Sequence, residues 1–252
     1  MIEKYASNKE YDSLFTTLTR EQVADDITIG KKVLDIAAGS AYFSILLAKR
    51  NPDSHITIVD IFDGSIKQAM KNIEKASLTA RINAIRMDAS DLDFKENEFD
   101  TVVNYLGLED IHMTRGVTGV QKTFQEVYRV LKRGGSFYFV VMPRDQMDTI
   151  PQKLEVDVFS WICGATWLDT DKYIEFARAA GFIFKRMQSY FTRKKLTVKQ
   201  AKEEIEYACH NVPLNYGVKT KSFQETWEKF GSLIQEHGMG HYSKTVLFEV
   251  EK

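Results

Sequence analysis

The chain has 252 residues, of which 44% are hydrophobic and 27% are charged, enough apolar material for the core of a single domain. It carries 34 Lys and Arg residues against 35 Asp and Glu residues and is nearly neutral. This balance gives no electrostatic sign of a nucleic-acid partner or of binding to an anionic membrane.

From residue 32 onward, short β-branched runs alternate with helical patterns, which is typical of a doubly wound α/β sheet. The predicted strands of this part are Lys32–Ile36, His55–Asp60, Ile82–Met87, Phe99–Asn104 and Ser136–Met142. The predicted helices between them are Tyr42–Arg50, Ser65–Ser77 and Thr118–Leu131. The last of these helices carries Val120, Phe124, Val127 and Leu131 on one face.

After residue 143 the pattern predicts helices over 151–163 and Asp171–Ala180, followed by strands over Phe182–Phe191 and Lys244–Glu251. The segment between these two strands contains two amphipathic stretches, Thr197–Cys209 and Ser222–His237. Their apolar faces cannot be buried in the sheet, so they must pack on each other, over the sheet edge or over a ligand. We therefore interpret residues 192–243 as a helical lid.

The stretch VLDIAAGSA joins the first strand to the first helix, and its residues from Ala37 to Ala41 carry almost no side-chain bulk. Parallel sheets bind ligands at the carboxyl ends of their strands, so this turn can lie against a nucleoside. A dinucleotide site needs G-x-G-x-x-G, whereas here only Gly39 is present. Asp35 would repel a pyrophosphate and attract the ammonium group of a methionine-like tail.

Further polar residues follow the next strands. Asp60 closes the second strand, where an acidic side chain accepts hydrogen bonds from both hydroxyls of a ribose. Asp88 follows the third strand and can accept from an exocyclic amine such as that of adenine. The fourth strand ends at Asn104 and Tyr105. Together these residues indicate an adenosine with a polar tail, and S-adenosylmethionine fits this chemistry.

The chain resembles the class I S-adenosylmethionine-dependent methyltransferases in several motifs that occur in the family's order. These are VLDIAAGSAYFS, ITIVDIF, MDASDLDFKENEFDTVV and EVYRVLKRGGSFYFVVMP. The resemblance implies a seven-stranded Rossmann-like sheet, mostly parallel with its last strand antiparallel, and a helical insertion between the last two strands. It also implies S-adenosylmethionine as the cofactor.

The resemblance further implies roles for individual residues. The implied cofactor-binding residues are Asp35 and Gly39 at the methionine portion, Ala37 in the same turn, Asp60 at the ribose, Ile61, Phe62, Asp88 and Ala89 at the adenine, and Asn104 beside the sulfonium. Ala37 and Ala41 replace two glycines that are common in the family, although alanine disfavours positive φ.

A general base is needed only where the methyl acceptor is protonated at neutral pH. The stretch GLEDIHMTRG follows the fourth strand and is expected to be a loop where the acceptor enters. It offers Glu109, Asp110 and His112, and an imidazole has a pKa suited to the task.

A second candidate region is HGMGH, at residues 237–241, next to Tyr242. The two histidines have the spacing of a helical metal pair, but Gly238 and Gly240 disfavour a helix there. No metal site is therefore expected, and we interpret the stretch as a lid hinge with a substrate-facing His or Tyr. The catalytic candidates are thus His112, Asp110 and Tyr242.

We expect one methyltransferase domain over residues 1–252. Its parts are an N-terminal helical cap (1–30), a cofactor-binding core (31–143) and the lid (192–243). The fourth strand is followed by NYLG, not by N/D-P-P-Y/F or Pro-Cys, which argues against methylation of DNA adenine, protein amides or cytosine. A small-molecule acceptor methylated on N, O, S or C is favoured. The alternatives are a side chain of a specific protein, or a regulatory protein that binds the cofactor without catalysis.

The two cysteines, Cys163 and Cys209, lack metal-ligand spacing and indicate a reducing compartment. The polar N-terminal stretch contains no signal peptide or membrane anchor. We therefore expect a cytoplasmic protein with a small-molecule substrate and without a nucleic-acid or membrane partner.

Overall fold

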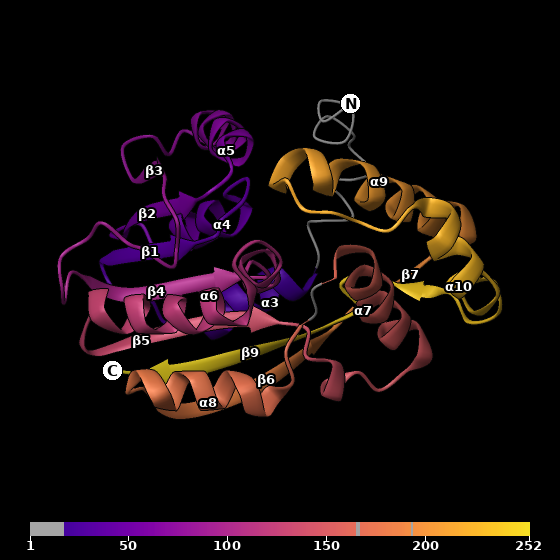
Figure 1. Ribbon diagram of the computed structural model, residues 1–252. Coiled ribbons are helices and arrows are strands. Elements are labelled where there is room, and N and C mark those ends of the chain that lie inside the picture. Colours follow the sequence, from indigo (N-terminus) through magenta and orange to yellow (C-terminus); the bar gives the residue numbers. More distant parts are fainter. Residues whose placement is uncertain (1–17, 165–166, 193) are drawn as a thin grey trace.

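The computed structural model describes residues 18–164, 167–192 and 194–252, so most of the predicted cap at 1–30 lies outside the described residues. Seven strands form one sheet in the order β3-β2-β1-β4-β5-β9-β6 (Figure 1). The strands are β1 (Lys32–Ile36), β2 (His55–Asp60), β3 (Ile82–Arg86), β4 (Phe99–Tyr105), β5 (Leu131–Val141), β6 (Ile183–Phe191) and β9 (Lys244–Glu251). Only β9 runs antiparallel to its neighbours in this described sheet, which confirms the predicted fold class.

Helices cover both faces of the sheet (Figure 1). The helices are α3 (Leu18–Asp26), α4 (Tyr42–Arg50), α5 (Asp63–Lys75), α6 (Leu108–Val130), the 3₁₀ turn η1 (Arg144–Gln146), α7 (Ile150–Cys163), α8 (Thr170–Ala180), α9 (Val198–Tyr216) and α10 (Phe223–His237). Helices α6 and α8 pack on one face, while α3, α4 and α5 pack on the other. A mostly parallel sheet is stable in this arrangement because both of its faces are apolar.

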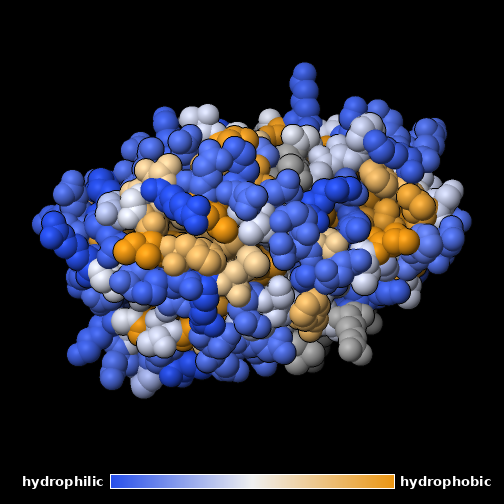
Figure 2. Space-filling view, turned by 90° about the horizontal axis from the view of Figure 1, so that it is seen from below, coloured by the Kyte–Doolittle hydropathy of each residue, from blue (hydrophilic) through white to orange (hydrophobic). Residues whose placement is uncertain are grey.

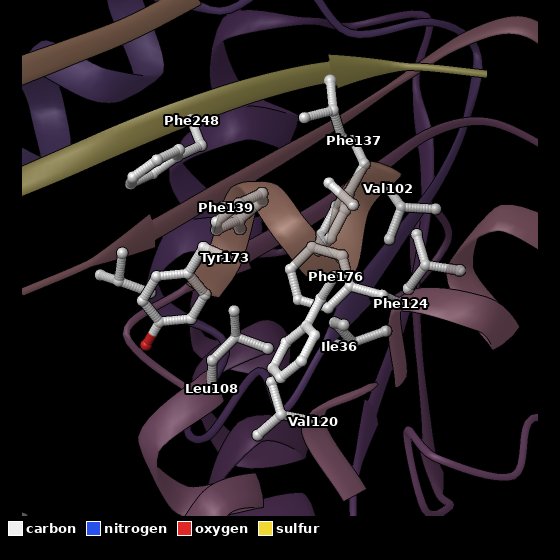
Figure 3. Close-up of a cluster of buried hydrophobic side chains, with 14 of the residues drawn as sticks. Ile36, Val102, Leu108, Val120, Phe124, Phe137, Phe139, Tyr173, Phe176 and Phe248 are labelled. Carbon is white, nitrogen blue, oxygen red and sulfur yellow. The ribbon is translucent and has the colours of Figure 1, made fainter. Parts of the chain in front are cut away.

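Alternation along the strands divides the core into two layers. In β1, Leu34 and Ile36 face α6, whereas Val33 faces α4, as the two-residue period of a strand requires. The layer under α6 and α8 is built largely of aromatic rings (Figure 3). The Phe124 ring meets that of Phe139 edge to face at 5.2 Å, and Phe139 stacks on Phe248 at 4.9 Å.

The segment between β6 and β9 forms a helical lobe together with α7 (Figure 1). Helices α9 and α10 bury their apolar faces against α7 in a third hydrophobic cluster, and the short strands β7 (Lys195–Leu196) and β8 (Met239–Gly240) pair beside it. Capping boxes formed by Thr197 with Gln200 and by Ser222 with Glu225 begin the two helices.

The structure corrects the predicted loop at residues 107–116. This segment is the first part of α6, and the predicted helix 118–131 is its second part. Gly116 separates the two parts, with φ 68° and ψ −176°. The two glycines at the ends of the segment suggested a loop, but a helix begins directly after Gly107 and carries Glu109, Asp110 and His112.

The surface seen in Figure 2 is mostly hydrophilic, with hydrophobic side chains gathered under the sheet and under the helical lobe. The edge strand β6 contributes exposed hydrophobic residues at Ile183, Met187 and Phe191. Across residues 18–164, 167–192 and 194–252, every helix is too short or too polar to cross a bilayer.

We expect the aromatic layer to contribute strongly to the stability of the fold. We expect Phe124→Ala to lower the free energy of unfolding by about 3–5 kcal/mol, because Phe124 is fully buried and its removal leaves a cavity. Phe191→Ala is the matched control, since the Phe191 side chain is 50% exposed and its loss should cost less than half as much. Urea unfolding of both variants measures the difference, and equal losses would contradict the assignment of the core.

Candidate active site

The turn after β1 has left-handed backbone at Ala37, Gly39 and Ala41, with φ values of 48°, 55° and 66°. Asp60 at the end of β2 holds this turn in place. Its carboxylate accepts hydrogen bonds from the backbone N–H groups of Gly39 and Phe62, both at 2.9 Å. The carboxyl ends of β1 and β2 are thereby joined by one side chain.

Asn104 fixes the neighbouring strand end. Its amide donates to the Ile36 carbonyl at 2.7 Å, and its side-chain oxygen accepts from the Gly107 N–H at 3.2 Å. A Cβ atom on Gly107 would lie 2.7 Å from the Ala37 carbonyl oxygen, so only glycine permits this close approach. The amide of Asn104, predicted to border the sulfonium, is thus engaged with the backbone.

Asp35 is almost completely buried at the base of the turn. One carboxylate oxygen accepts from the Ser44 hydroxyl at 2.6 Å, while Oδ1 has no hydrogen-bond partner among the described residues. Burial raises the pKa of Asp35 from 3.8 to about 7, although the Ser44 hydrogen bond opposes this. An orphaned carboxylate oxygen in this place fits a ligand that brings an ammonium group.

A narrow pocket, with about 20 Å³ of free space, opens above these strand ends. It is lined by Ala37, Asp60, Ile61, Met87, Asp88, Ala89, Asp110, Ile111, Thr114, Arg115 and Tyr216. Five of the predicted cofactor residues are therefore brought together, whereas Asp35, Gly39, Phe62 and Asn104 do not line it. Three carboxylates line this pocket, and those of Asp60 and Asp88 suit the hydroxyls and the amine of an adenosine.

Two carboxylates of the narrow pocket, those of Asp60 and Asp88, have pKa values shifted in opposite directions. Burial raises the pKa of Asp60 above its usual value, against the two backbone hydrogen bonds that the side chain accepts. Partial burial acts on Asp88 in the same direction, but hydrogen bonds from Ser90 and Arg115 hold its pKa below the usual value. The Arg115–Asp88 ion pair, at 2.7 Å, closes one side of the pocket.

A large cavity of about 270 Å³ adjoins the narrow pocket. Its walls come from α6, α7, α9 and the residues before β9, and include Glu109, Asp110, Glu155, Trp167, Glu204, Tyr207, His241 and Tyr242. Asp110 and Tyr216 belong to both spaces. The Tyr216 hydroxyl donates to the Asp110 carboxylate at 3.3 Å, and its ring lies 5.9 Å from that of Phe62.

Two of the three catalytic candidates lie at this cavity. Burial and the charge of Asp60 raise the pKa of Asp110 to about 7. Tyr242, with φ 47°, lines the cavity, and its backbone N–H donates to Glu155. His112 is half-buried on α6 and lines neither space. Within the described residues, no three His, Cys, Asp or Glu side chains lie together as metal ligands.

Sequence reasoning missed Glu155, Glu204 and Tyr216. Glu204 stands in the apolar stripe of α9 between Ala201 and Ala208, and Glu155 interrupts the corresponding stripe of α7. A carboxylate in an otherwise apolar helix face is the signal that could have identified both glutamates. Tyr216 lies beyond the predicted end of its helix, so its sequence position carried no such signal.

The raised pKa of Asp35 makes the stability of the fold depend on pH. Its pKa is about 7 in the folded chain and 3.8 when unfolded, so the unfolded chain loses its proton first. The contribution of Asp35 to stability therefore falls as the pH rises from about 4 to about 7. We expect Asp35→Asn to raise the free energy of unfolding by about 2 kcal/mol at pH 8 and to leave it unchanged at pH 4.

Denaturant unfolding without added ligand at both pH values measures this effect. Asp88→Asn is the control, because the lowered pKa of Asp88 predicts the opposite sign, a loss of stability at pH 8. If Asp35→Asn had a lower free energy of unfolding than the native chain at pH 8, the buried carboxylate of Asp35 would not destabilise the folded state.

Comparison with known proteins agrees with this geometry. Residues 33–135 match a family described as a methyltransferase domain. The chain is 27% identical over 132 residues to a demethylmenaquinone methyltransferase of Bacteroides fragilis, covering 52% of this chain and 51% of that protein. It is 29% identical over 147 residues to the ubiquinone/menaquinone biosynthesis C-methyltransferase UbiE of Cereibacter sphaeroides, covering 57% and 56%.

The chain thus spans about half the length of these relatives. Among solved structures, a SAM-dependent methyltransferase from Methanosarcina mazei shares its fold, with a TM-score of 0.60 and 14% identity over 92% of this chain and 96% of that one. The strand order, the site at the carboxyl ends of the strands and the matching family agree. Residues 33–135 therefore match a methyltransferase domain family, and the described chain has the fold of an S-adenosylmethionine-dependent methyltransferase.

Proposed function

We propose that this protein transfers a methyl group from S-adenosylmethionine to a small-molecule acceptor bound in the large cavity. The observation that carries the proposal is that the narrow pocket and the large cavity share Asp110 and Tyr216. A cofactor in one space and an acceptor in the other would meet at these two side chains. The relatives are named as demethylmenaquinone and ubiquinone/menaquinone biosynthesis methyltransferases, which supports a small molecule as the acceptor.

The residues of the narrow pocket would hold the adenosine portion. Asp60 would accept hydrogen bonds from the ribose and Asp88 from the adenine amine, while Ile61 and Ala89 would contact the ring. Asp35 would pair with the ammonium group of the methionine portion. When bound, the cofactor supplies an activated methyl group, so the protein contributes mainly by holding the acceptor in line.

Asp110 is the residue we propose as proton acceptor. Its position between the two spaces puts it beside a bound acceptor, and a pKa near 7 suits a group that takes up a proton at neutral pH. Tyr216 orients the carboxylate through its hydrogen bond. His112, which lines neither space, has no comparable position.

The alternative of a protein substrate would need an apolar docking face on the lid. In α9 and α10, the exposed large hydrophobic side chains among the described residues are Leu214 and Leu233, each on a different helix. Single exposed hydrophobic residues are normal on protein surfaces. The large cavity of about 270 Å³ therefore favours the small molecule.

Cofactor binding is tested by Asp60→Ala. We expect its affinity for S-adenosylmethionine and for the demethylated product to fall by about 1–3 kcal/mol in calorimetric titration, because the ribose and two backbone N–H groups lose their acceptor. Asp63→Ala, an exposed carboxylate three residues along, is the control and should bind like the native chain. Unchanged affinity of Asp60→Ala would refute its assigned role.

Turnover is tested by incubating the protein with S-adenosylmethionine and a panel of naphthoquinols, phenols, thiols and amines, and by measuring release of the demethylated cofactor. With an acceptor that turns over, Asp110→Asn should lower kcat by about 10²–10⁴-fold, the range typical of a lost general base. Asp53→Asn, at an exposed aspartate, controls for the substitution. A kcat within threefold of the native value would exclude Asp110 as the proton acceptor.

A further inference from the structure

The walls of the large cavity carry several acidic side chains. Four carboxylate side chains line it, those of Glu109, Asp110, Glu155 and Glu204. Among its described lining residues there is no Lys or Arg. The basic residue among the described lining residues is His241. Burial, with a smaller effect from the charge of Lys194, lowers the pKa of its imidazole to about 4, so the ring is neutral at neutral pH.

The four carboxylates differ in the partners that the protein gives them. Glu155 accepts a hydrogen bond from the Ser243 hydroxyl at 3.0 Å, and Asp110 accepts from Tyr216. Glu204 is only 8% exposed, lines the cavity, and makes no hydrogen bond or ion pair with any residue in the described part of the chain. Glu109 likewise has no such partner within the described ranges.

An unpartnered carboxylate at position 204 works against folding. The neighbouring positions on this face of α9, Ala201, Ile205 and Ala208, are buried in the third hydrophobic cluster. An apolar side chain at 204 would extend that cluster, whereas a buried carboxylate loses its hydration without compensation. Burial raises the pKa of Glu204 to about 7, and the charges of Glu203 and Glu155 act in the same direction. A cation bound in the cavity would supply the missing partner.

The remaining walls suit an organic cation. Aromatic rings of Phe159, Trp167 and Tyr207 face the cavity, and the faces of such rings attract ammonium groups. The carboxylates do not form a group of metal ligands among the described residues. A neutral quinol could donate hydrogen bonds in this cavity, but it would leave Glu109 and Glu204 without a counter-charge.

We infer that the methyl acceptor is an amine that binds as a cation, with Glu204 and Glu109 as its counter-charges and the aromatic side chains around its apolar part. This inference rests on the proposed function and names its substrate class. It makes the protein an N-methyltransferase that recognises the charge of its acceptor before the acceptor reacts.

Methyl transfer to an ammonium nitrogen requires that the nitrogen first lose a proton. One N–H proton passes to the carboxylate of Asp110, which frees the nitrogen lone pair. The N–C bond forms as the C–S bond of the bound cofactor breaks, and the electron pair of that bond remains on sulfur as a thioether. The products are the methylated amine and the demethylated cofactor, and no oxidant or reductant is needed.

The test is calorimetric titration of the full chain saturated with the demethylated cofactor. The probes are n-butylamine, 2-phenylethylamine and tryptamine, each paired with its isosteric alcohol n-butanol, 2-phenylethanol or tryptophol, together with 1,4-naphthoquinol. We expect at least one amine to bind about tenfold or more tightly than its alcohol. Glu204→Gln should remove this preference, because it keeps the shape of the side chain and abolishes its charge.

Glu203→Gln is the matched control, since Glu203 precedes Glu204 on the same helix and its side chain is 54% exposed. It should leave amine affinity within about twofold of the native value. Three results would each overturn the inference. The first is that the alcohols or the naphthoquinol bind as tightly as the amines, and the second is that no amine binds at about 10 mM. The third is an unchanged amine affinity in Glu204→Gln.

Failure of the proposed function itself gives a different result. It would appear as absent binding of both forms of the cofactor to the native chain before any amine is added. Native cofactor affinity in Glu204→Gln shows that the variant is folded, so loss of amine binding alone reports on the cavity.

Discussion

The narrow pocket and the helical lobe meet because β6 ends, and β9 begins, on the side of the sheet where the parallel strands have their carboxyl ends. β9 runs antiparallel to both neighbours, so Phe191 at the end of β6 pairs with Lys244 at the start of β9. The carboxyl ends of the parallel strands lie on this side, where such sheets bind ligands. A segment inserted between these two residues therefore leaves and rejoins the sheet beside the narrow pocket. This strand order brings Glu204 and Tyr216 to the site.

The cofactor half of the molecule was largely predictable from the sequence because its signals are local. β1 and β2 have the predicted bounds, and the turn between β1 and α4 lies where it was predicted, with positive φ at Ala37 and Ala41 although alanine disfavours it. The start of α6 was not predictable in the same way. Gly107 looks like a helix breaker in the sequence, but it is needed where the chain after β4 approaches Ala37, a contact between distant segments.

The acceptor half was predictable only in outline. The periodicity identified two helices in the insertion, yet nothing local told which of their faces would meet α6 and α7. Glu155 and Glu204 are far apart in the sequence, and each looks like an isolated flaw in an apolar stripe. Their meaning depends on the cavity they share, and a shared cavity is a property of tertiary packing. Periodicity therefore predicts the helices of the insertion but not the chemical class of the acceptor.

Helix α9 carries both Tyr216, which walls the narrow pocket, and Glu204, which walls the large cavity. The narrow pocket has about 20 Å³ of free space, room for about one or two waters, so its walls, to which Tyr216 belongs, must open before a ligand the size of a nucleoside enters. A displacement of α9 that uncovers one space uncovers the other as well. In kinetic terms this coupling favours an ordered sequence, in which the cofactor enters first, the acceptor follows, and both products wait for the same reopening.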